Sequence, residues 1–305
     1  MIDREGEPYV VAIIPDLEPT SRLDRCVELL ARICADVRAA ADAIRGRLGL
    51  WLCLPEAFAS TETSLFQVAI GRELGRTDLA VQVVARGHAS GLLALHRARA
   101  QVESGNLDAA ILLGVDSYID PDVLEALDQG GELMSDANKF GFPPGEAAAA
   151  LLVAADGTLR NAGLPILGRV VDVGIGIEPE PMGSQGVSTG RGLAAAIDGA
   201  TKQFSPQVPV GRIYSDQNGQ RYRDSDYVWA TQRVRPVFEE FSDFVTPAEA
   251  WGDVGAATGL LLVGFSLALA PHLRQRSPAT LVYACSVGAD RAAVTLHHDS
   301  IAWAP

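Results

Sequence analysis

The stretch LAVQVVARGHASGLLALH, residues 79–96, decides the fold of this chain. Its first seven residues are mostly apolar and include three valines, which predicts a buried β-strand over 79–85. The Ala- and Leu-rich run that follows predicts a buried helix over 89–100. His88 is therefore expected in the turn between them, at a helix N-terminus where backbone N–H groups face outward. Gly87 lets the chain turn sharply there.

Apolar periodicity and turn residues predict further elements on both sides of this stretch. Strand and helix alternate in each half of the chain, which is typical of an α/β protein. We expect strands over 10–14, 48–54, 147–155, 166–173, 210–214, 279–284 and 292–297, and a turn followed by a buried strand within 106–117. We expect helices over 21–44, 60–74, 192–203, 224–235 and 256–270, with a short helix starting at Asp120-Pro121.

Composition narrows the function classes. The chain has 305 residues, of which 48% are hydrophobic, and carries a formal net charge of −13. This charge disfavours nucleic-acid binding, because phosphate would be repelled. Four arginines form the nearest approach to a basic cluster, but acidic residues are interleaved with them and we expect a solvated face: Arg221, Arg223, Arg233 and Arg235.

The four cysteines predict no metal site, since none forms a CxxC pair and no histidine follows at ligand spacing. Cys26 and Cys34 lie on one face of a predicted helix, and Cys285 is expected to be a buried structural thiol. No signal peptide is expected at the N-terminus, so a reducing cytoplasm is predicted. The uncharged run 254–270 is expected inside a core rather than in a membrane.

The segment RGHASGLLALH, residues 86–96, resembles the nucleophile elbow of β-ketoacyl-ACP synthases, which belong to the thiolase superfamily. Those enzymes carry Ala-Cys-Ala-Ser-Gly or a near variant at this place. Here His88 stands at the cysteine position. Two further stretches resemble the ketosynthase pattern, GVDS at 114–117 and FPPGEA at 142–147, although the family has Gly where this chain has Ala147.

The second half carries the counterparts of the two catalytic histidine segments of ketosynthases. SDQNGQ at 215–220 and WGDVGAATG at 251–259 match their glycines and small residues. Both histidine positions hold aspartate, namely Asp216 and Asp253. SVGADRAAV at 286–294 resembles the terminal Gly-rich loop of the family.

The resemblance implies a thiolase-like fold in which two similar α/β halves are stacked in α-β-α-β-α layers. We place the first half at residues 1–160 and the second at 161–305. The halves show no obvious sequence repeat, so this duplication follows from the resemblance and not from periodicity.

The resemblance also implies which catalytic groups have changed. Claisen condensation needs a thiolate to hold the acyl chain and N–H donors for the developing oxyanion. Imidazole forms no stable thioester, and ionised carboxylates accept hydrogen bonds without donating them. No confident catalytic residue is therefore assigned. The degenerate positions are His88, Asp216 and Asp253, and the pocket residues are Gly87, Ser90, Asn218, Gly252 and Gly288.

Three interpretations of His88, Asp216 and Asp253 remain open at this point. The old pocket is refilled by hydrogen-bonded polar residues, with His88 bridging to an aspartate. Alternatively, a relic pocket still binds an acyl chain or carrier protein without turnover. The third alternative is new chemistry, in which the three groups hold a divalent cation or His88 acts as a base toward water or Ser90. No cofactor and no resident metal are expected.

The predicted function is that of a degenerate β-ketoacyl synthase-like pseudoenzyme of the acyltransferase family, acting as a dimeric binding or assembly partner. The strand 79–85 is expected to pair across a two-fold axis in a homodimer or in a heterodimer with a ketosynthase, as in chain-length-factor subunits. An acyl carrier protein, acyl-CoA or a secreted-toxin accessory role are further options. The alternative function is an acyltransferase or thioester hydrolase with a rebuilt His/Asp site.

Overall fold

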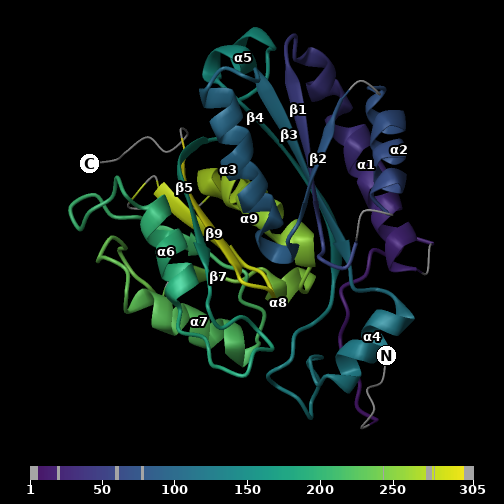
Figure 1. Ribbon diagram of the computed structural model, residues 1–305, viewed down its shortest axis with the longest axis vertical. Helices are drawn as coiled ribbons and strands as arrows, with labels where there is room; N and C mark the ends of the chain where they lie inside the picture. The colour runs from purple at the N-terminus through teal and green to yellow at the C-terminus, as the bar shows by residue number, and fades with distance from the viewer. Residues whose placement is uncertain are drawn as a thin grey trace.

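The computed structural model describes residues 6–18, 21–58, 62–76, 79–242, 244–272, 277 and 279–298. Two β-sheets lie in separate layers, with helices α3 and α9 between them (Figure 1). Helices α1 and α2 cover the outer face of one sheet, and α6 and α7 cover the outer face of the other (Figure 1). This is the α-β-α-β-α arrangement predicted from the sequence, so the predicted fold class is confirmed.

The first sheet has the strand order β2-β1-β3-β4. β1 runs parallel to both β2 and β3, and β4 runs antiparallel to β3. The strands are β1 (Leu48–Leu54), β2 (Val81–Ala85), β3 (Ala109–Ser117) and β4 (Glu146–Ala154). All residues of β1 and β3 are buried, which explains their continuous apolar sequence.

The second sheet has the order β5-β9-β8-β6-β7. β6 is parallel to β7 and β8, while β9 is antiparallel to both β8 and β5. Its strands are β5 (Arg169–Ile177), β6 (Arg212–Tyr214), β7 (Phe244–Val245), β8 (Ala279–Cys285) and β9 (Asp290–His297).

The helices begin and end near the predicted positions. Ser21 caps the first helix, since its side chain accepts a hydrogen bond from the Asp24 N–H, and Asp120 caps the fourth in the same way. The α-helices are α1 (Arg22–Ala43), α2 (Thr63–Leu74), α3 (Ser90–Glu103), α4 (Pro121–Gln129), α5 (Asp156–Asn161), α6 (Arg191–Ala200), α7 (Arg221–Thr231), α8 (Ala248–Trp251) and α9 (Thr258–Leu269); the 3₁₀ turns are η1 (Gly87–Ala89), η2 (Gly255–Ala257) and η3 (Ala270–His272).

Two sequence expectations, the strand over 10–14 and the helix start at Ser60, are not matched by the described structure. The strand predicted over 10–14 is wrong: this stretch makes one bridge, between Ala12 and Gly145, and belongs to neither sheet. Apolar composition identified it as a strand, but whether a strand forms depends on a neighbour elsewhere in the chain. Ser60, expected at the start of the second helix, lies outside the described residues.

Helices α3 and α9 pack against each other through glycine. A Cβ atom at Gly91 would lie 2.7 Å from the Leu260 Cγ and 2.9 Å from its backbone nitrogen. Gly91 therefore allows α9 to approach the first turn of α3 closely. α9 carries no charged residue and packs in the core between the sheets through Leu260, Leu262 and Val263. Across the described residues, no helix is both long and apolar enough to cross a membrane.

We expect Gly91→Ala to lower the free energy of unfolding by about 1–3 kcal/mol, because the added methyl group overpacks the contact with Leu260. Gly264→Ala is the matched control: it also lies in a central helix, but its added Cβ meets no atom within 4 Å. Helix propensity alone makes this control neutral or more stable by up to about 1 kcal/mol. Urea unfolding midpoints measure both effects, and equal stability of the two variants would contradict the close contact.

Candidate functional site

The nucleophile-elbow segment forms the turn that its sequence predicts. β2 ends at Ala85, a 3₁₀ turn covers Gly87–Ala89, and α3 begins at Ser90. Gly87 has φ of 61°, a left-handed conformation that favours glycine. His88 is consequently held at the N-terminus of α3, with only 3% of its surface exposed.

A second turn of the same kind opens α9. There a 3₁₀ turn begins at Gly255, which also has positive φ, at 49°. The segments GHASGLL at 87–93 and GAATGLL at 255–261 share five of seven residues. No obvious sequence repeat was expected, but this short one is present. It lies at the starts of α3 and α9, which pack against each other in the centre of the molecule. Asp253 lies just before the second turn.

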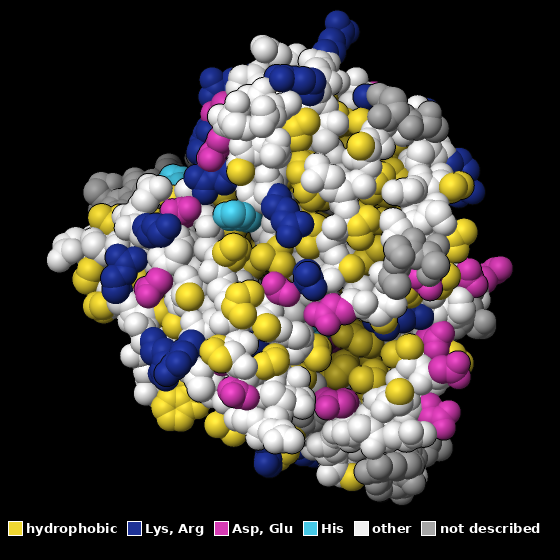
Figure 2. All heavy atoms as spheres, viewed as in Figure 1, with side chains coloured by type: hydrophobic (Ala, Val, Ile, Leu, Met, Phe, Trp, Pro, Cys, Tyr) yellow, Lys and Arg dark blue, Asp and Glu magenta, His cyan; other side chains and the backbone are white. Residues whose placement is uncertain are grey.

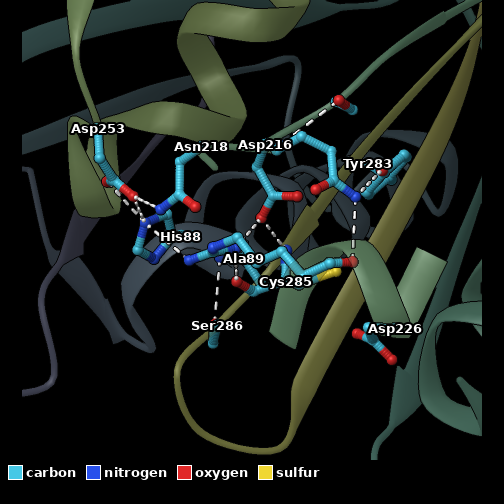
Figure 3. A network of polar contacts seen from close by, with 12 residues as sticks. His88, Ala89, Asp216, Asn218, Asp226, Asp253, Tyr283, Cys285 and Ser286 are labelled. Atoms are coloured by element: carbon cyan, nitrogen blue, oxygen red, sulfur yellow. Dashed lines mark hydrogen bonds and ion pairs between the residues drawn. The ribbon is translucent and has the colours of Figure 1, made fainter. Parts of the chain in front are cut away.

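His88 and Asp253 form a buried hydrogen-bonded pair that joins distant parts of the chain. The His88 Nε2 lies 2.7 Å and 2.9 Å from the two carboxylate oxygens of Asp253 (Figure 3). Burial by itself raises the pKa of Asp253. The imidazole of His88, its hydrogen bond and the guanidinium of Arg223 together outweigh burial and hold that pKa well below its usual range.

Two other donors complete the surroundings of Asp253. The Asn218 side-chain amide donates to it at 2.6 Å and the Gly255 backbone N–H at 2.8 Å. Asn218 also donates to Gln220, which in turn donates to Glu132 on the loop after α4. The carboxylate is therefore fully engaged by groups of the chain itself.

Asp216 is paired with Arg223 rather than with Asp253. The Arg223 Nη1 donates to Asp216 at 2.6 Å, and the Cys285 backbone N–H donates to the same oxygen at 2.5 Å. Burial raises the pKa of Asp216, and the charge of Arg223 opposes that rise.

Arg223 lies close to both aspartates and to His88, whereas the sequence pattern predicts a solvated position for it. Its Nη2 lies 3.1 Å from the His88 Nε2, and only 3% of the arginine is exposed. The expectation of a solvated face is therefore wrong for Arg223. It holds for Arg221, which is exposed and lies over the Phe140 ring. The two are two residues apart and so lie on nearly opposite faces of α7, but the charge pattern does not show which of these faces is buried.

The tautomer of His88 follows from these partners. A guanidinium only donates, and the ionised Asp253 only accepts. Nε2 therefore carries the hydrogen and donates it to Asp253, while the contact with Arg223 joins two donors. The arrangement leaves no acceptor on Nε2 for a proton from water or Ser90.

Ser90 has backbone partners instead of facing His88. Its hydroxyl accepts from the Arg86 N–H at 2.8 Å and donates to the Leu54 carbonyl at 3.3 Å. The Ala89 N–H at the elbow is likewise engaged, by the Ser286 hydroxyl at 3.2 Å. Ser286 also donates to the Arg86 carbonyl. Ser286, which sequence reasoning did not single out, thus holds the loop after β8 against the elbow.

The remaining predicted pocket residues, Gly252 and Gly288, lie where a larger side chain would contact neighbouring atoms closely. Gly252 has φ of 76°, and a Cβ there would lie 2.9 Å from the Pro143 carbonyl oxygen. Gly288 lies beside Glu56, 2.9 Å from where its Cβ would stand. Next to Gly252, Asp253 pairs with the first half through its backbone: its N–H donates to Pro143 at 2.7 Å, and its carbonyl accepts from Gly145 at 2.8 Å.

The space left at this centre is small. A cavity of about 10 Å³ is lined by His88, Asp216, Asp253, Ser215 and Thr258 among others. A cavity of this size holds about one water molecule. An acyl chain does not fit in it.

The cysteine thiols are buried, and the described residues offer no metal-binding cluster. All four cysteines are free and buried. Burial raises the pKa of Cys285 well above its ordinary value, and it raises that of Cys34 to about 12. Within the described ranges, no group of three or more His, Cys, Asp or Glu side chains could hold a metal ion. Arg223, rather than a metal ion, lies between His88 and Asp216.

The comparisons with known proteins agree with this architecture. Residues 74–159 match the family "Beta-ketoacyl synthase, N-terminal domain". No curated protein sequence matches the chain.

Solved ketosynthase structures share the fold at low sequence identity. The ketosynthase from module 6 of the bacillaene synthase of Bacillus subtilis 168 is 15% identical with a TM-score of 0.70, and the match covers 94% of this chain and 60% of that one. The oxazolomycin ketosynthase domain of Streptomyces albus is 15% identical with a TM-score of 0.71, covering 94% and 60%. AntDE–AntF, a type II PKS acyl-carrier protein in complex with its ketosynthase, is 14% identical with a TM-score of 0.73, covering 97% and 89%.

The chain thus has the thiolase-like fold of ketosynthases and spans about 60% of the length of the first two. The elbow and the strands β2, β3 and β4 lie inside the segment that matches the ketosynthase family.

We expect Asp253→Asn to lower the free energy of unfolding by about 3–5 kcal/mol at neutral pH, because it removes the buried carboxylate that accepts the hydrogen bond of His88 and lies close to the charge of Arg223. The folded-state pKa of Asp253 lies below its unfolded value, so its contribution is present above about pH 4 and is lost as the pH falls further. The difference between wild type and variant should therefore shrink below about pH 4.

Urea unfolding at several pH values measures this difference. Asp224→Asn is the control, since Asp224 is exposed on the same α7 helix that carries Arg223; we expect a change within about 0.5 kcal/mol. A loss that stayed constant from neutral pH to pH 3 would contradict a stabilising, ionised Asp253.

Proposed function

We propose that this chain is a ketosynthase-fold protein without condensing activity, which acts as a dimeric binding or assembly partner. The observation that carries the proposal is the buried network of His88, Asp253, Arg223 and Asp216. These groups are hydrogen-bonded or in close contact with one another and fill the region at the N-terminus of α3.

The groups that condensation requires are missing or engaged elsewhere, which supports the proposed loss of condensing activity. His88 offers no thiolate, and burial disfavours ionisation of the four cysteines of the chain. The elbow N–H of Ala89 is engaged by Ser286, so it is not free to stabilise an oxyanion. Asp253 and Asp216 accept hydrogen bonds where an enolate oxygen would need donors.

Acylation tests this part of the proposal. Incubation with acyl-CoA or an acylated carrier protein should leave the intact mass of the chain unchanged, because no nucleophile is exposed at the elbow. An active ketosynthase treated in parallel is the positive control. A stable acyl adduct, or release of free acid above the rate of a His88→Ala variant, would favour the acyltransferase or hydrolase alternative.

The dimer rests on the free edge of the first sheet. β2 is the terminal strand of that sheet; Gln82 is exposed, Val84 is buried, and the other three residues are partly buried. On the neighbouring helix α2, Leu65 and Val68 are 50% and 69% exposed. An exposed strand edge beside apolar side chains is suited to pairing with another strand. We propose that the partner is a second copy or an active ketosynthase, which would bind an acyl carrier protein.

The surface and the cysteines agree with a protein partner in the cytoplasm. Basic and acidic side chains are interspersed on the face shown in Figure 2, rather than gathered into one basic patch. The four free cysteines fit a reducing compartment.

We expect Gln82→Lys to weaken the dimer at least about tenfold, because the two new charges would face each other near the two-fold axis. Gln82 is exposed in the middle of β2. Gln129→Lys on α4 adds the same charge at an exposed position away from this edge and should leave the dimer intact. Sedimentation equilibrium measures both. A wild-type monomer of 32.2 kDa at all concentrations, alone and mixed with ketosynthases, would overturn the partner role.

A further inference from the structure

Ser90 and Thr258 occupy the same place in the two halves of the chain. They are the fourth residues of GHASGLL at 87–93 and GAATGLL at 255–261, and they open helices α3 and α9. Ser90 is completely buried and Thr258 is 7% exposed. Each position therefore buries a hydroxyl group that needs a hydrogen-bond partner.

The two hydroxyl groups differ in their partners. Ser90 is bonded on both sides, because it accepts from the Arg86 N–H at 2.8 Å and donates to the Leu54 carbonyl at 3.3 Å. The Oγ1 of Thr258 is buried and has no hydrogen-bond partner among the described residues. Burying an unbonded hydroxyl is unfavourable, and native proteins satisfy most such groups with a protein atom or an ordered water. The difference therefore indicates a partner for Thr258 that is not part of the chain.

The small cavity at the centre adjoins the Thr258 side chain. Its volume of about 10 Å³ is close to what one water molecule needs and is too small for an organic ligand. A buried water also needs two to four polar partners, so the polar part of the lining decides what the cavity holds. The polar lining residues are His88, Ser215, Asp216, Asp253 and Thr258, and the apolar ones include Pro247, Trp251 and Leu262.

Asp216 has one carboxylate oxygen without a partner. Its Oδ2 accepts from the Arg223 Nη1 at 2.6 Å and from the Cys285 N–H at 2.5 Å. None of the residues that the structure describes donates to its Oδ1, and Figure 3 shows this oxygen without a dashed line. An ionised carboxylate accepts hydrogen bonds through both oxygens. Oδ1 is thus an acceptor that remains available to a donor in the cavity that Asp216 lines.

His88 lines the same cavity and has one ring nitrogen without a partner. Its Nε2 makes the contacts with Asp253 and Arg223. With the hydrogen on Nε2, the Nδ1 is an acceptor, and no residue in the described part of the chain donates to it. The cavity therefore combines a hydroxyl that donates with two acceptors. This set matches water, which accepts one hydrogen bond and donates two.

We propose that this cavity is the binding site of one permanently held water molecule. The water accepts a hydrogen bond from the Thr258 hydroxyl and donates its hydrogens to the Asp216 Oδ1 and the His88 Nδ1. A neutral ligand fits better than a cation, because Arg223 already compensates the charge of Asp216. The water site does not depend on the proposed loss of condensing activity, since it follows from the cavity and its unbonded groups alone.

Counting the long-lived waters of the full chain tests the site. Oxygen-17 relaxation dispersion counts them in solution, and a high-resolution crystal structure should locate one at about 2.5–3.0 Å from the Thr258 Oγ1 and the Asp216 Oδ1. Thr258→Val keeps the shape of the side chain without its hydroxyl and should remove this water, whereas Thr258→Ser should retain it. Thr295→Val is the matched control: its buried hydroxyl donates to the Ala200 carbonyl at 2.7 Å, so the number of long-lived waters should not change.

Urea unfolding gives a second, independent readout. With the water bound, Thr258→Val should lower the unfolding midpoint, because the water and its acceptors lose the hydroxyl donor. In a dry cavity the same substitution removes an unbonded hydroxyl, so the midpoint would rise or stay unchanged, and this result would overturn the proposal. A wild-type chain without the water, or a water that stays in place in Thr258→Val, would overturn it as well.

Discussion

The structure depends on one buried carboxylate. Asp253 is 4% exposed, and removing an ionised carboxylate from water is tolerated only when donors surround it. Those donors come from the turn before α3, from the loop after β6 and from the turn before α9. The charge at Asp253 therefore requires all three backbone segments to converge. The glycine contacts between α3 and α9 let them do so without a steric clash.

Much of the centre could be predicted from local sequence. Gly87 between an apolar strand and an Ala/Leu helix predicts the elbow, and Ser21 predicts the start of α1, because both signals act within a few residues. The resemblance to ketosynthases brought His88, Asp216 and Asp253 into one hypothesis, and the structure places them in one network. Of the three interpretations, the geometry is that of mutually bonded polar residues.

Other features depend on contacts between distant residues, which a single sequence does not show. Arg223 has charged neighbours on both sides, and only the arrival of Asp216 and Asp253 makes its burial possible. The stretch 10–14 is apolar enough for a strand, but strand formation needs an edge to pair with. The heptapeptide shared by the starts of α3 and α9 was visible in the sequence. It is short and the residues around it differ, so it does not stand out by periodicity.

The backbone pairing of Pro143 and Gly145 with Asp253 has a consequence for how the molecule holds together. Asp253, whose side chain contacts His88, also makes two backbone hydrogen bonds to the loop before β4. Side-chain and main-chain contacts of one residue therefore join the two sheets. Neither half can satisfy its own buried polar groups when isolated. A fragment ending between β4 and β5 would leave His88, Pro143 and Gly145 without their partner Asp253, and the complementary fragment would leave the Asp253 carboxylate without the donor His88. The layers therefore form a single cooperative unit, whose duplicated plan does not make it divisible.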